Sequence, residues 1–268
     1  MITFPNCKVN LGLQLTEKRP DGYHNLISCF YPVAWRDALE IIPADTFAFS
    51  SSGIPIPGDP ATNLCVRAYE QLRADFALPP VRMHLHKIVP IGAGLGGGSA
   101  DAAFTLTLLN EQFGLGLAPA QLEHYARRLG SDCAFFIRNK PVYCVEKGDV
   151  FEPITVDLTG YTLALIYPNL SVSTAEAYAG VTPKPPAVSL RDALSRPVAE
   201  WRDTVHNDFE DSLFPRYPAL AAIKATLYEQ GALYASMSGS GSTVYGIFPA
   251  SVDLKNQFSR YSVWQGNL

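Results

Sequence analysis

The sequence lacks the features that mark secreted, membrane-spanning and zinc-stabilised proteins. It has only five cysteines in 268 residues, an odd number with no CxxC pair. This scarcity predicts neither a disulfide framework nor a zinc site, and we expect buried or incidental thiols. No run of about 18 apolar residues is present, and the opening MITFPNCKVNLGL lacks a basic segment followed by a long apolar one. These absences predict a soluble, cytoplasmic protein with no membrane partner.

Charge is also scarce. Charged residues make up 17% of the chain and the net charge is −4, with a pI near 5.7. No broad basic field exists for nucleic acid or an anionic membrane, so we expect no nucleic-acid partner. An anionic ligand has to be held locally, by backbone amides and a few cations. Hydrophobic residues, in contrast, reach 47%, which is enough for a packed core, and the length favours two domains.

Strand and helix patterns are mixed along the chain without regular βαβ alternation, which predicts an α+β fold. Strands are expected at 7–15, 26–33, 38–42, 81–89, 142–146, 161–167, 233–237 and 243–248. Helices are expected at 62–76, 99–113 and 119–129 and near residues 174, 190, 208 and 220. Residues 50–60, rich in serine, glycine and proline, predict a loop. The character changes after residue 153, so the expected domains are 1–153 and 154–268.

The most informative segment is rich in glycine and runs from Pro90 to Ala100 as PIGAGLGGGSA. It follows a predicted strand and opens a predicted helix, so its backbone N–H groups and the helix N-terminus converge on one place. Such a place binds anions, and a di- or triphosphate is its usual occupant. Glycine suits this loop because side chains would block close approach of the backbone, and some positions require positive φ.

Several known loops compete for this segment. Residues Gly92 to Gly97 satisfy G-x-G-x-x-G, but the acidic partner of a dinucleotide site should end a second strand, and Glu111 falls inside the same predicted helix. A Walker A loop needs a following lysine, and none occurs between Lys87 and Lys140. The other motifs of a protein kinase are absent. A glycine-rich turn without a ligand is the plain structural alternative.

Three ordered motifs make the chain resemble the GHMP kinase family. The glycine-rich segment fits P-x3-G-L-G-S/G-S-S/A, with Ala100 where a second serine is frequent. The opening KVNLGLQLTEKRPDGYHNL resembles the first motif of the diphosphocytidyl-methylerythritol kinases within that family, and SMSGSGSTVYGIF at 236–248 resembles the third motif. The resemblance spans nearly the whole chain. It implies a two-domain GHMP kinase fold, with an N-terminal ribosomal-S5-domain-2-like α/β domain and a C-terminal ferredoxin-like α/β-plait domain.

The resemblance also assigns residues to roles. It implies that Asp132 is the catalytic base and that Lys8 pairs with it and polarises the acceptor oxygen; without the resemblance, a turn aspartate and a surface lysine are the simpler readings. The ATP loop is assigned to Pro90, Ile91, Gly92, Ala93, Gly94, Leu95, Gly96, Gly97, Gly98, Ser99 and Ala100. The ATP chemistry implies Mg²⁺ as well, but no carboxylate cage is visible and its ligands are left unassigned.

Further residues are expected at the substrate. By resemblance, the ring of Tyr23 stacks on a cytosine and His24 bonds the edge of the base. Tyr178 is placed to close the other face of the base, with core packing as the alternative. Asn10 is expected on the same strand face as Lys8, within reach of the acceptor diol. A wall of small residues beside the phosphates, with a plain turn as its alternative, is assigned to Ser238, Gly239, Ser240 and Gly241.

The resemblance implies transfer of the γ-phosphate of ATP to the 2-hydroxyl of 4-diphosphocytidyl-2-C-methyl-D-erythritol, a step of the non-mevalonate isoprenoid route, by a monomer or weak homodimer. The alternatives are another GHMP kinase, acting on homoserine, mevalonate or a sugar, and a nucleotide-binding sensor without catalysis. The segment Asp21 to His24 favours the cytidylated substrate over the other acceptors, because those acceptors have no base to clamp. Retention of both Lys8 and Asp132 argues against the sensor.

Overall fold

A computed structural model describes residues 1–268. The chain folds into two compact units, and each takes several stretches of sequence. Unit 1 consists of Met1–Lys8, Ala34–Ile91 and Gly96–Lys140; unit 2 consists of Val9–Val33, Gly92–Leu95 and Pro141–Leu268. The expected domain boundary after residue 153 stays a prediction. The mixture of helices and sheets in both units confirms the α+β class.

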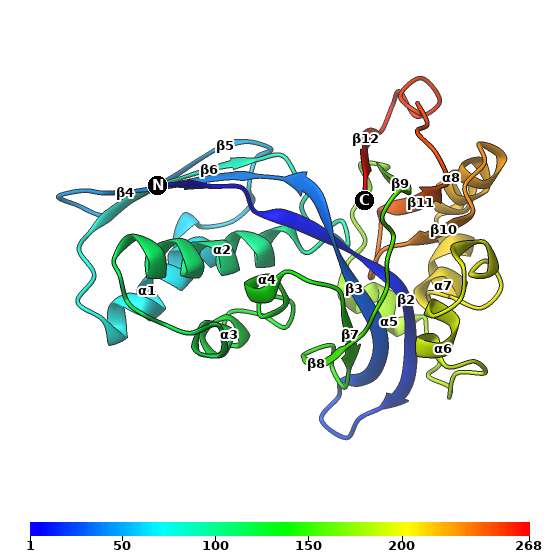
Figure 1. The fold of residues 1–268 in the computed structure, drawn as a ribbon, viewed down its shortest axis with the longest axis horizontal. Coiled ribbons are helices and arrows are strands. Elements are labelled where there is room, and N and C mark those ends of the chain that lie inside the picture. Colours follow the sequence, from blue (N-terminus) through cyan, green and yellow to red (C-terminus); the bar gives the residue numbers. More distant parts are fainter. The chain divides into compact units, whose positions relative to one another are not determined.

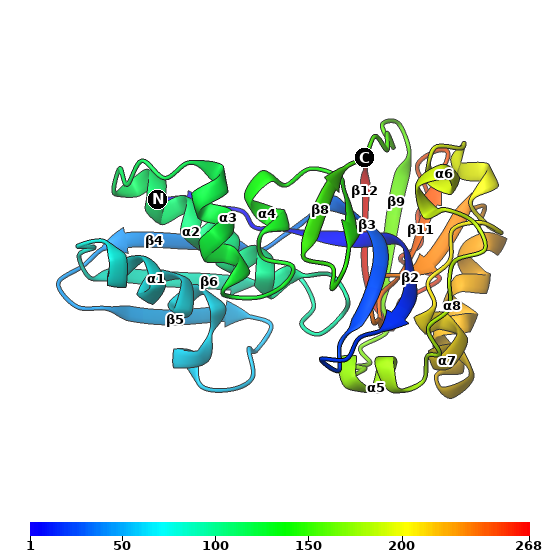
Figure 2. The ribbon, with the colours of Figure 1, turned by 90° about the horizontal axis from the view of Figure 1, so that it is seen from below.

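Unit 1 is a four-stranded sheet with helices over one face (Figures 1 and 2). The strand order is β1 (Ile2–Thr3), β4 (Ala38–Pro43), β6 (Val81–Lys87) and β5 (Ala48–Gly53). Its helices are α1 (Leu64–Asp75), α2 (Gly97–Gln112), α3 (Pro119–Arg127) and the short α4 (Phe135–Arg138), preceded by a 3₁₀ turn at Pro60–Thr62. Strand β6 alternates buried and more exposed residues, as its sequence predicts.

The expected loop at 50–60 is wrong for its first residues, because β5 reaches Gly53. This edge strand pairs in parallel with β6. The Ser50 hydroxyl lies 2.9 Å from His84 Nδ1, and the Ser52 hydroxyl lies 2.8 Å from His84 Nε2 and 2.9 Å from His86 Nδ1. Serine is not among the residues enriched in strands, but backbone pairing and these cross-strand bonds stabilise the strand. The two histidines therefore bond serines of the edge strand.

Helix α2 runs through the core of unit 1, as its apolar sequence predicts. It begins after Gly96, and its buried residues include Ala103, Leu106 and Leu109. Phe113 caps its end, and Gly114 follows with a φ of +60°. A helix that is apolar on almost every side has to be enclosed, and α1 and α3 lie beside it (Figure 2). This placement holds the glycine-rich segment at one end of a rigid, buried element.

Unit 2 contains two further sheets. One has the order β2 (Asn6–Lys18), β3 (His24–Arg36), β7 (Val142–Val145) and β8 (Val150–Pro153), and the first residues of β2 and the last of β3 belong to unit 1. The other has the order β10 (Tyr234–Met237), β11 (Val244–Phe248), β9 (Thr162–Tyr167) and β12 (Ser262–Asn267). The helices of unit 2 are α5 (Thr174–Ala179), α6 (Leu190–Leu194), α7 (Phe209–Arg216) and α8 (Pro218–Glu229), with a 3₁₀ turn at Val198–Glu200.

The core of unit 2 joins residues from both ends of the chain. Leu13 and Leu15 of β2 pack in one cluster with Phe209 of α7, Ile223 of α8 and Val244 of β11. Helix α8 lies along β10 and β11 (Figure 1). All five cysteines of the chain are buried and free of disulfides, as expected; burial raises the pKa of Cys7 to about 12. None of the helices combines the length and apolar character that crossing a bilayer requires.

Candidate functional site

The glycine-rich segment has the backbone that its sequence predicts. Gly94 and Gly96 have φ values of +77° and +68°, which disfavour residues with a side chain. Gly96 is the N-cap of α2, so the free N–H groups of the first helical turn follow directly after it. The outer residues of the segment, Pro90, Ile91 and Gly96 to Ala100, belong to unit 1, whereas Gly92 to Leu95 belong to unit 2.

Lys8 and Asp132 form an ion pair in unit 1. Lys8 Nζ lies 3.6 Å from Asp132 Oδ2, and the exposed fractions of the two side chains are 4% and 32%. The lysine stem lies against the backbone of Gly96, because a Cβ added there would be 3.3 Å from Lys8 Cγ and Cε. The structure thus brings the two predicted catalytic groups together at the start of α2, with the carboxylate partly open to solvent.

An amide pair lies near these two groups in the sequence and joins their elements. Asn6, two residues before Lys8 on β2, donates from Nδ2 to Asn139 Oδ1 at 3.2 Å, and Asn139 Nδ2 donates to Asn6 Oδ1 at 2.6 Å. Asn139 is the C-cap of α4 in the left-handed conformation. Asp132 lies in the turn between α3 and α4, so this reciprocal pair joins the strand that carries Lys8 to the end of the helix that follows Asp132.

Ser99 completes this group in unit 1. Its hydroxyl hydrogen-bonds the thiol of Cys133, the neighbour of Asp132; burial nonetheless raises the pKa of that thiol to about 11. A helix N-terminus with free N–H groups, a lysine and a carboxylate can together hold a phosphate and take up a proton from a hydroxyl. That combination fits phosphoryl transfer. No group of three or more His, Cys, Asp or Glu side chains is arranged to hold a metal ion.

A buried charge cluster, which the sequence analysis missed, lies beneath the start of α2. Lys87, at the end of β6, hydrogen-bonds Asp37 and donates to Asp101 of α2 at 2.8 Å. The exposed fractions of the three residues are 3%, 1% and 2%. A Cβ added at Gly97 would lie 3.0 Å from Lys87 Nζ. Lys87 therefore packs directly under the first residue of α2 and supports the backbone that should bind phosphate.

The two carboxylates of this cluster differ in their surroundings. Asp37 Oδ1 also accepts from the N–H groups of Ile88 and Val89, at 2.5 and 2.8 Å, whereas Asp101 Oδ1 has no hydrogen-bond partner. Burial raises the pKa of Asp101 to about 7; Lys87 opposes this effect and Asp37 adds to it. Burial disfavours the charge on Lys87, but Asp101 and Asp37 more than offset that effect and raise its pKa. Burial therefore favours the neutral form of Asp101.

The cluster had a signal in the sequence. Val81, Met83 and Leu85 are the buried residues of β6, and Lys87 continues the same phase of the strand. A lysine in the apolar phase of a strand requires buried partners. Asp101 is likewise the one charged residue in the apolar first half of α2. Pattern alone marks these residues as unusual, but only the fold shows that they meet.

Ser238 connects the third motif to the glycine-rich segment within unit 2. Its hydroxyl donates to the carbonyl of Gly94 at 2.8 Å and accepts from the N–H of Asn10 at 3.2 Å. Ser238 is fully buried, and so are Gly239 and Gly241, while Ser240 is half-exposed. Asn207, which sequence reasoning missed, donates from Nδ2 to the carbonyls of Met237 and Gly239. The predicted wall of small residues is therefore a loop that hydrogen bonds from Asn207 and Ser238 hold in place.

Asn10 is buried and its side chain is engaged. Its Nδ2 donates to Ser28 Oγ at 2.8 Å, and Ser28 in turn donates to the carbonyl of Gly12. The carbonyl of Asn10 accepts from Tyr245 Oη at 2.7 Å. These bonds hold β2 and β3 together at this point. A contact between Asn10 and a substrate diol stays a prediction.

Gly94→Ala is expected to destabilise the protein strongly. The new Cβ would overlap the carbonyl oxygen of Ser238, and φ is +77°. Gly114→Ala is the matched control, because φ is +60° there with open space around it. Strain alone should cost about 1–2 kcal/mol in the control, whereas strain plus overlap should cost about 4 kcal/mol or more at Gly94. Urea unfolding measures both, and equal losses would show that the Gly94–Ser238 approach is not tight.

Aromatic rings gather beside the turn at Asp21–Gly22 in unit 2. The rings of His24 and Tyr178 lie 5.0 Å apart, and Tyr178 also meets Phe209 edge-on at 5.0 Å. Burial, together with the nearby charge of Lys18, lowers the pKa of His24, so its ring is neutral at pH 7. Tyr23 is 62% exposed. The structure therefore pairs two of the predicted base-binding rings, His24 and Tyr178, and leaves the third, Tyr23, exposed with Lys147 Nζ 5.4 Å from the centre of its ring.

Comparisons with known proteins show the family of this chain. Residues 63–140 match the model for the GHMP kinases N terminal domain, and residues 190–261 match the model for the GHMP kinases C terminal. A protein of Bacteroides thetaiotaomicron named 4-diphosphocytidyl-2-C-methyl-D-erythritol kinase is 56% identical over 252 residues, 92% of each chain. A protein of the same name from Parabacteroides distasonis is 50% identical over 270 residues and is aligned over 100% of both chains.

A solved structure shares the fold over the same length. The crystal structure of a 4-(cytidine 5'-diphospho)-2C-methyl-D-erythritol kinase has a TM-score of 0.82 and 29% identity, covering 99% of this chain and 98% of that chain. The fold, the Lys8–Asp132 pair at the start of α2 and these relatives lead to one assignment. The chain belongs to the GHMP kinase family and, within it, to the 4-diphosphocytidyl-2-C-methyl-D-erythritol kinases.

Proposed function

We propose that this chain transfers the γ-phosphate of ATP to the 2-hydroxyl of 4-diphosphocytidyl-2-C-methyl-D-erythritol, releasing ADP, in the non-mevalonate route to isoprenoid precursors. The names of relatives at 50–56% identity support the substrate. The observation that carries the chemistry is the Lys8–Asp132 ion pair against Gly96, directly before the free N–H groups of α2.

Each residue has a part in this proposal. The loop amides and the N-terminus of α2 hold the phosphates of ATP, because aligned N–H groups favour anions. Lys8 fixes the orientation of the Asp132 carboxylate and contacts the acceptor oxygen. Asp132 accepts the proton of the acceptor hydroxyl as its oxygen attacks the γ-phosphorus and the bond to ADP breaks. Lys87, Asp37 and Asp101 act beneath the loop as positioning residues.

We further propose that Mg²⁺ accompanies ATP, that the enzyme works in the cytoplasm and that it is a monomer or weak homodimer. Mg²⁺ neutralises phosphate charge and retains several waters, so it needs few protein ligands. Two side chains near the start of α2 carry oxygen atoms that could bind Mg²⁺. They are Asp132, which pairs with Lys8, and Ser99, which hydrogen-bonds Cys133. These two residues fit an ion held mainly by phosphates and water.

Phosphate transfer to a panel of acceptors tests the proposal. The panel holds the cytidylated alcohol, its cytidine-free parent, mevalonate, homoserine and galactose, each with γ-labelled ATP and magnesium. Transfer to the cytidylated alcohol alone is expected. Transfer to a different acceptor would support the kinase assignment but contradict the proposed substrate. Binding of ATP without any transfer would favour a nucleotide sensor without catalysis.

His24→Phe is expected to weaken selection of the cytidylated acceptor. Phenylalanine keeps a ring beside Tyr178 but removes both ring nitrogens, so polar atoms of the base lose a partner. A lost bond of about 1–3 kcal/mol lowers kcat/KM for that acceptor about 10- to 100-fold, while KM for ATP stays unchanged. His86→Phe, on the exposed side of β6, is the control and should leave both constants unaltered. An unchanged kcat/KM in His24→Phe would remove His24 from base recognition.

A further inference from the structure

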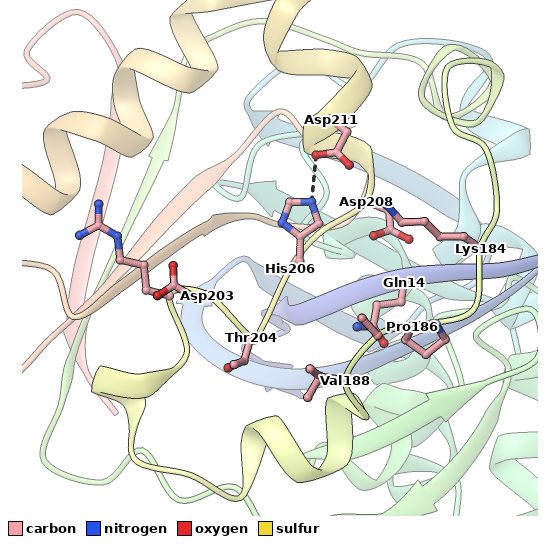
Figure 3. A pocket seen from close by; sticks show the side chains of 11 residues that line it. Gln14, Lys184, Pro186, Val188, Asp203, Thr204, His206, Asp208 and Asp211 are labelled. Atoms are coloured by element: carbon pink, nitrogen blue, oxygen red, sulfur yellow. Dashed lines mark hydrogen bonds and ion pairs between the residues drawn. The ribbon is translucent and has the colours of Figure 1, made fainter.

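A cavity of about 260 Å³ lies wholly within unit 2. Its walls come from three separate stretches: β2, the proline-rich connector that begins near Lys184, and the segment between the Val198 turn and α7 (Figure 3). Backbone bonds pin these stretches together. Lys184 donates to the carbonyl of Leu15, and Leu13 donates to the carbonyl of His206. No role in phosphoryl transfer has been assigned to the residues that line it.

The buried end of this cavity carries hydrogen-bond acceptors. Gln14 of β2 is 8% exposed, and its Oε1 has no hydrogen-bond partner. Asp208 is 7% exposed, and its Oδ2 accepts from the N–H of Leu15 at 2.7 Å. Figure 3 shows both side chains directed into the cavity. A buried acceptor left unpaired costs about 1–3 kcal/mol, so this end should favour a guest that brings N–H donors.

The charges around the cavity are mixed, and a carboxylate, that of Asp208, lies at its buried end. Its lining includes two basic residues, Lys184 and Arg202, three acidic ones, Asp203, Asp208 and Asp211, and His206. The outer groups already have partners: His206 lies 3.0 Å from Asp211 Oδ1, and Arg202 lies over the ring of Tyr228.

Asp208 is the charged group at the buried end. Burial raises its pKa; the N–H of Leu15 and the charges of His206 and Lys184 oppose that rise, and Asp211 adds to it. A cationic guest would compensate the same buried carboxylate.

We propose that this cavity binds a small molecule with a primary ammonium group, which donates hydrogen bonds to Gln14 Oε1 and the carboxylate of Asp208. A metal ion is a poor alternative, because no three His, Cys, Asp or Glu side chains converge there. The volume holds a guest of several non-hydrogen atoms, and the mixed charges at the rim can accept a polar tail. The site is independent of the kinase reaction.

Ethanolamine, choline and glycolate are matched probes for this site. Ethanolamine carries the ammonium donors, choline has the same charge without N–H groups, and glycolate reverses the charge. Titration followed by ¹H–¹⁵N NMR should show saturable ethanolamine binding with a Kd of about 1 mM, as suits so small a ligand. The amide signals of Leu15 and Asp208 should shift. Choline should bind at least tenfold more weakly, and glycolate should not bind.

Two variants locate the binding. Gln14→Met removes the unpaired acceptor at similar volume, so ethanolamine binding should weaken at least tenfold while the unfolding temperature stays equal or rises. Asp208→Asn keeps an oxygen for the N–H of Leu15 and should weaken binding similarly. Gln71→Met is the control, because Gln71 Oε1 is also buried and unpaired but lies on α1 of unit 1; it should bind ethanolamine as the unaltered protein does.

The proposal is overturned by any of three results: ethanolamine fails to saturate the signals, choline or glycolate binds as well, or Gln14→Met retains full affinity. These experiments measure ligand binding and protein unfolding, not phosphate transfer. A negative result would therefore not affect the kinase assignment.

Discussion

Asp132→Asn is expected to lower kcat by about 10²–10⁴-fold, the range for loss of a positioned general base. The amide keeps the size of the carboxylate but cannot accept the proton of the acceptor hydroxyl. ATP should bind equally well or slightly more tightly, because a negative charge near the phosphates disappears. Single-turnover transfer of labelled phosphate measures the chemical step, and equilibrium titration measures ATP binding.

Asp149→Asn is a close control for this variant. Asp149 lies 3.8 Å from Lys147 Nζ and its side chain is 32% exposed, the same fraction as for Asp132. The control should retain kcat, since its ion pair is remote from the glycine-rich segment in sequence and belongs to unit 2. A near-normal chemical step in Asp132→Asn would reject Asp132 as the base while leaving the fold and family intact.

Lys87→Met is expected to destabilise the protein by about 3–5 kcal/mol, the usual cost of breaking a buried ion pair from one side. Methionine fills much of the lysine stem but leaves the carboxylates of Asp37 and Asp101 buried without their cation. The backbone of Gly97 loses its support as well, so KM for ATP should rise even where the variant stays folded. Denaturant unfolding at pH 7 measures the first effect, and steady-state kinetics measures the second.

Asp101→Asn separates charge from packing in this cluster. The folded pKa of Asp101, about 7, lies above the ordinary value of 3.8, so between these values the folded state binds the extra proton. The contribution of Asp101 to stability is therefore present below pH 3.8 and is lost as pH rises towards 7. Asp101→Asn should abolish that part of the pH dependence and cost little near neutral pH. A large loss at pH 7, equal to that of Lys87→Met, would mean that Asp101 has to be ionised.

Local patterns in the sequence determined most of the regular structure. The alternation in VRMHLHK specifies β6, and the apolar run after Gly97 specifies a buried α2, because periodicity and burial are properties of each segment by itself. The glycine-rich motif likewise predicted positive φ values and a helix start. The three motifs together indicated the family and the two candidate catalytic residues, Lys8 and Asp132. Edge elements were harder: β5 is rich in serine and β12 is only half-buried, so neither carries a strong pattern.

Other features were decided only by the tertiary structure, because they join residues that are distant in the chain. Lys8 and Asp132, which approach to 3.6 Å, are 124 positions apart, and so are brought together only by the fold. The cluster of Lys87 with Asp37 and Asp101 depends on how β6 and α2 pack. The cavity at Gln14 forms because three stretches of the chain meet in unit 2. A sequence states which groups are present and how each segment folds. Distances between segments follow from packing, which minimises exposed apolar surface and unpaired polar groups over the whole chain at once.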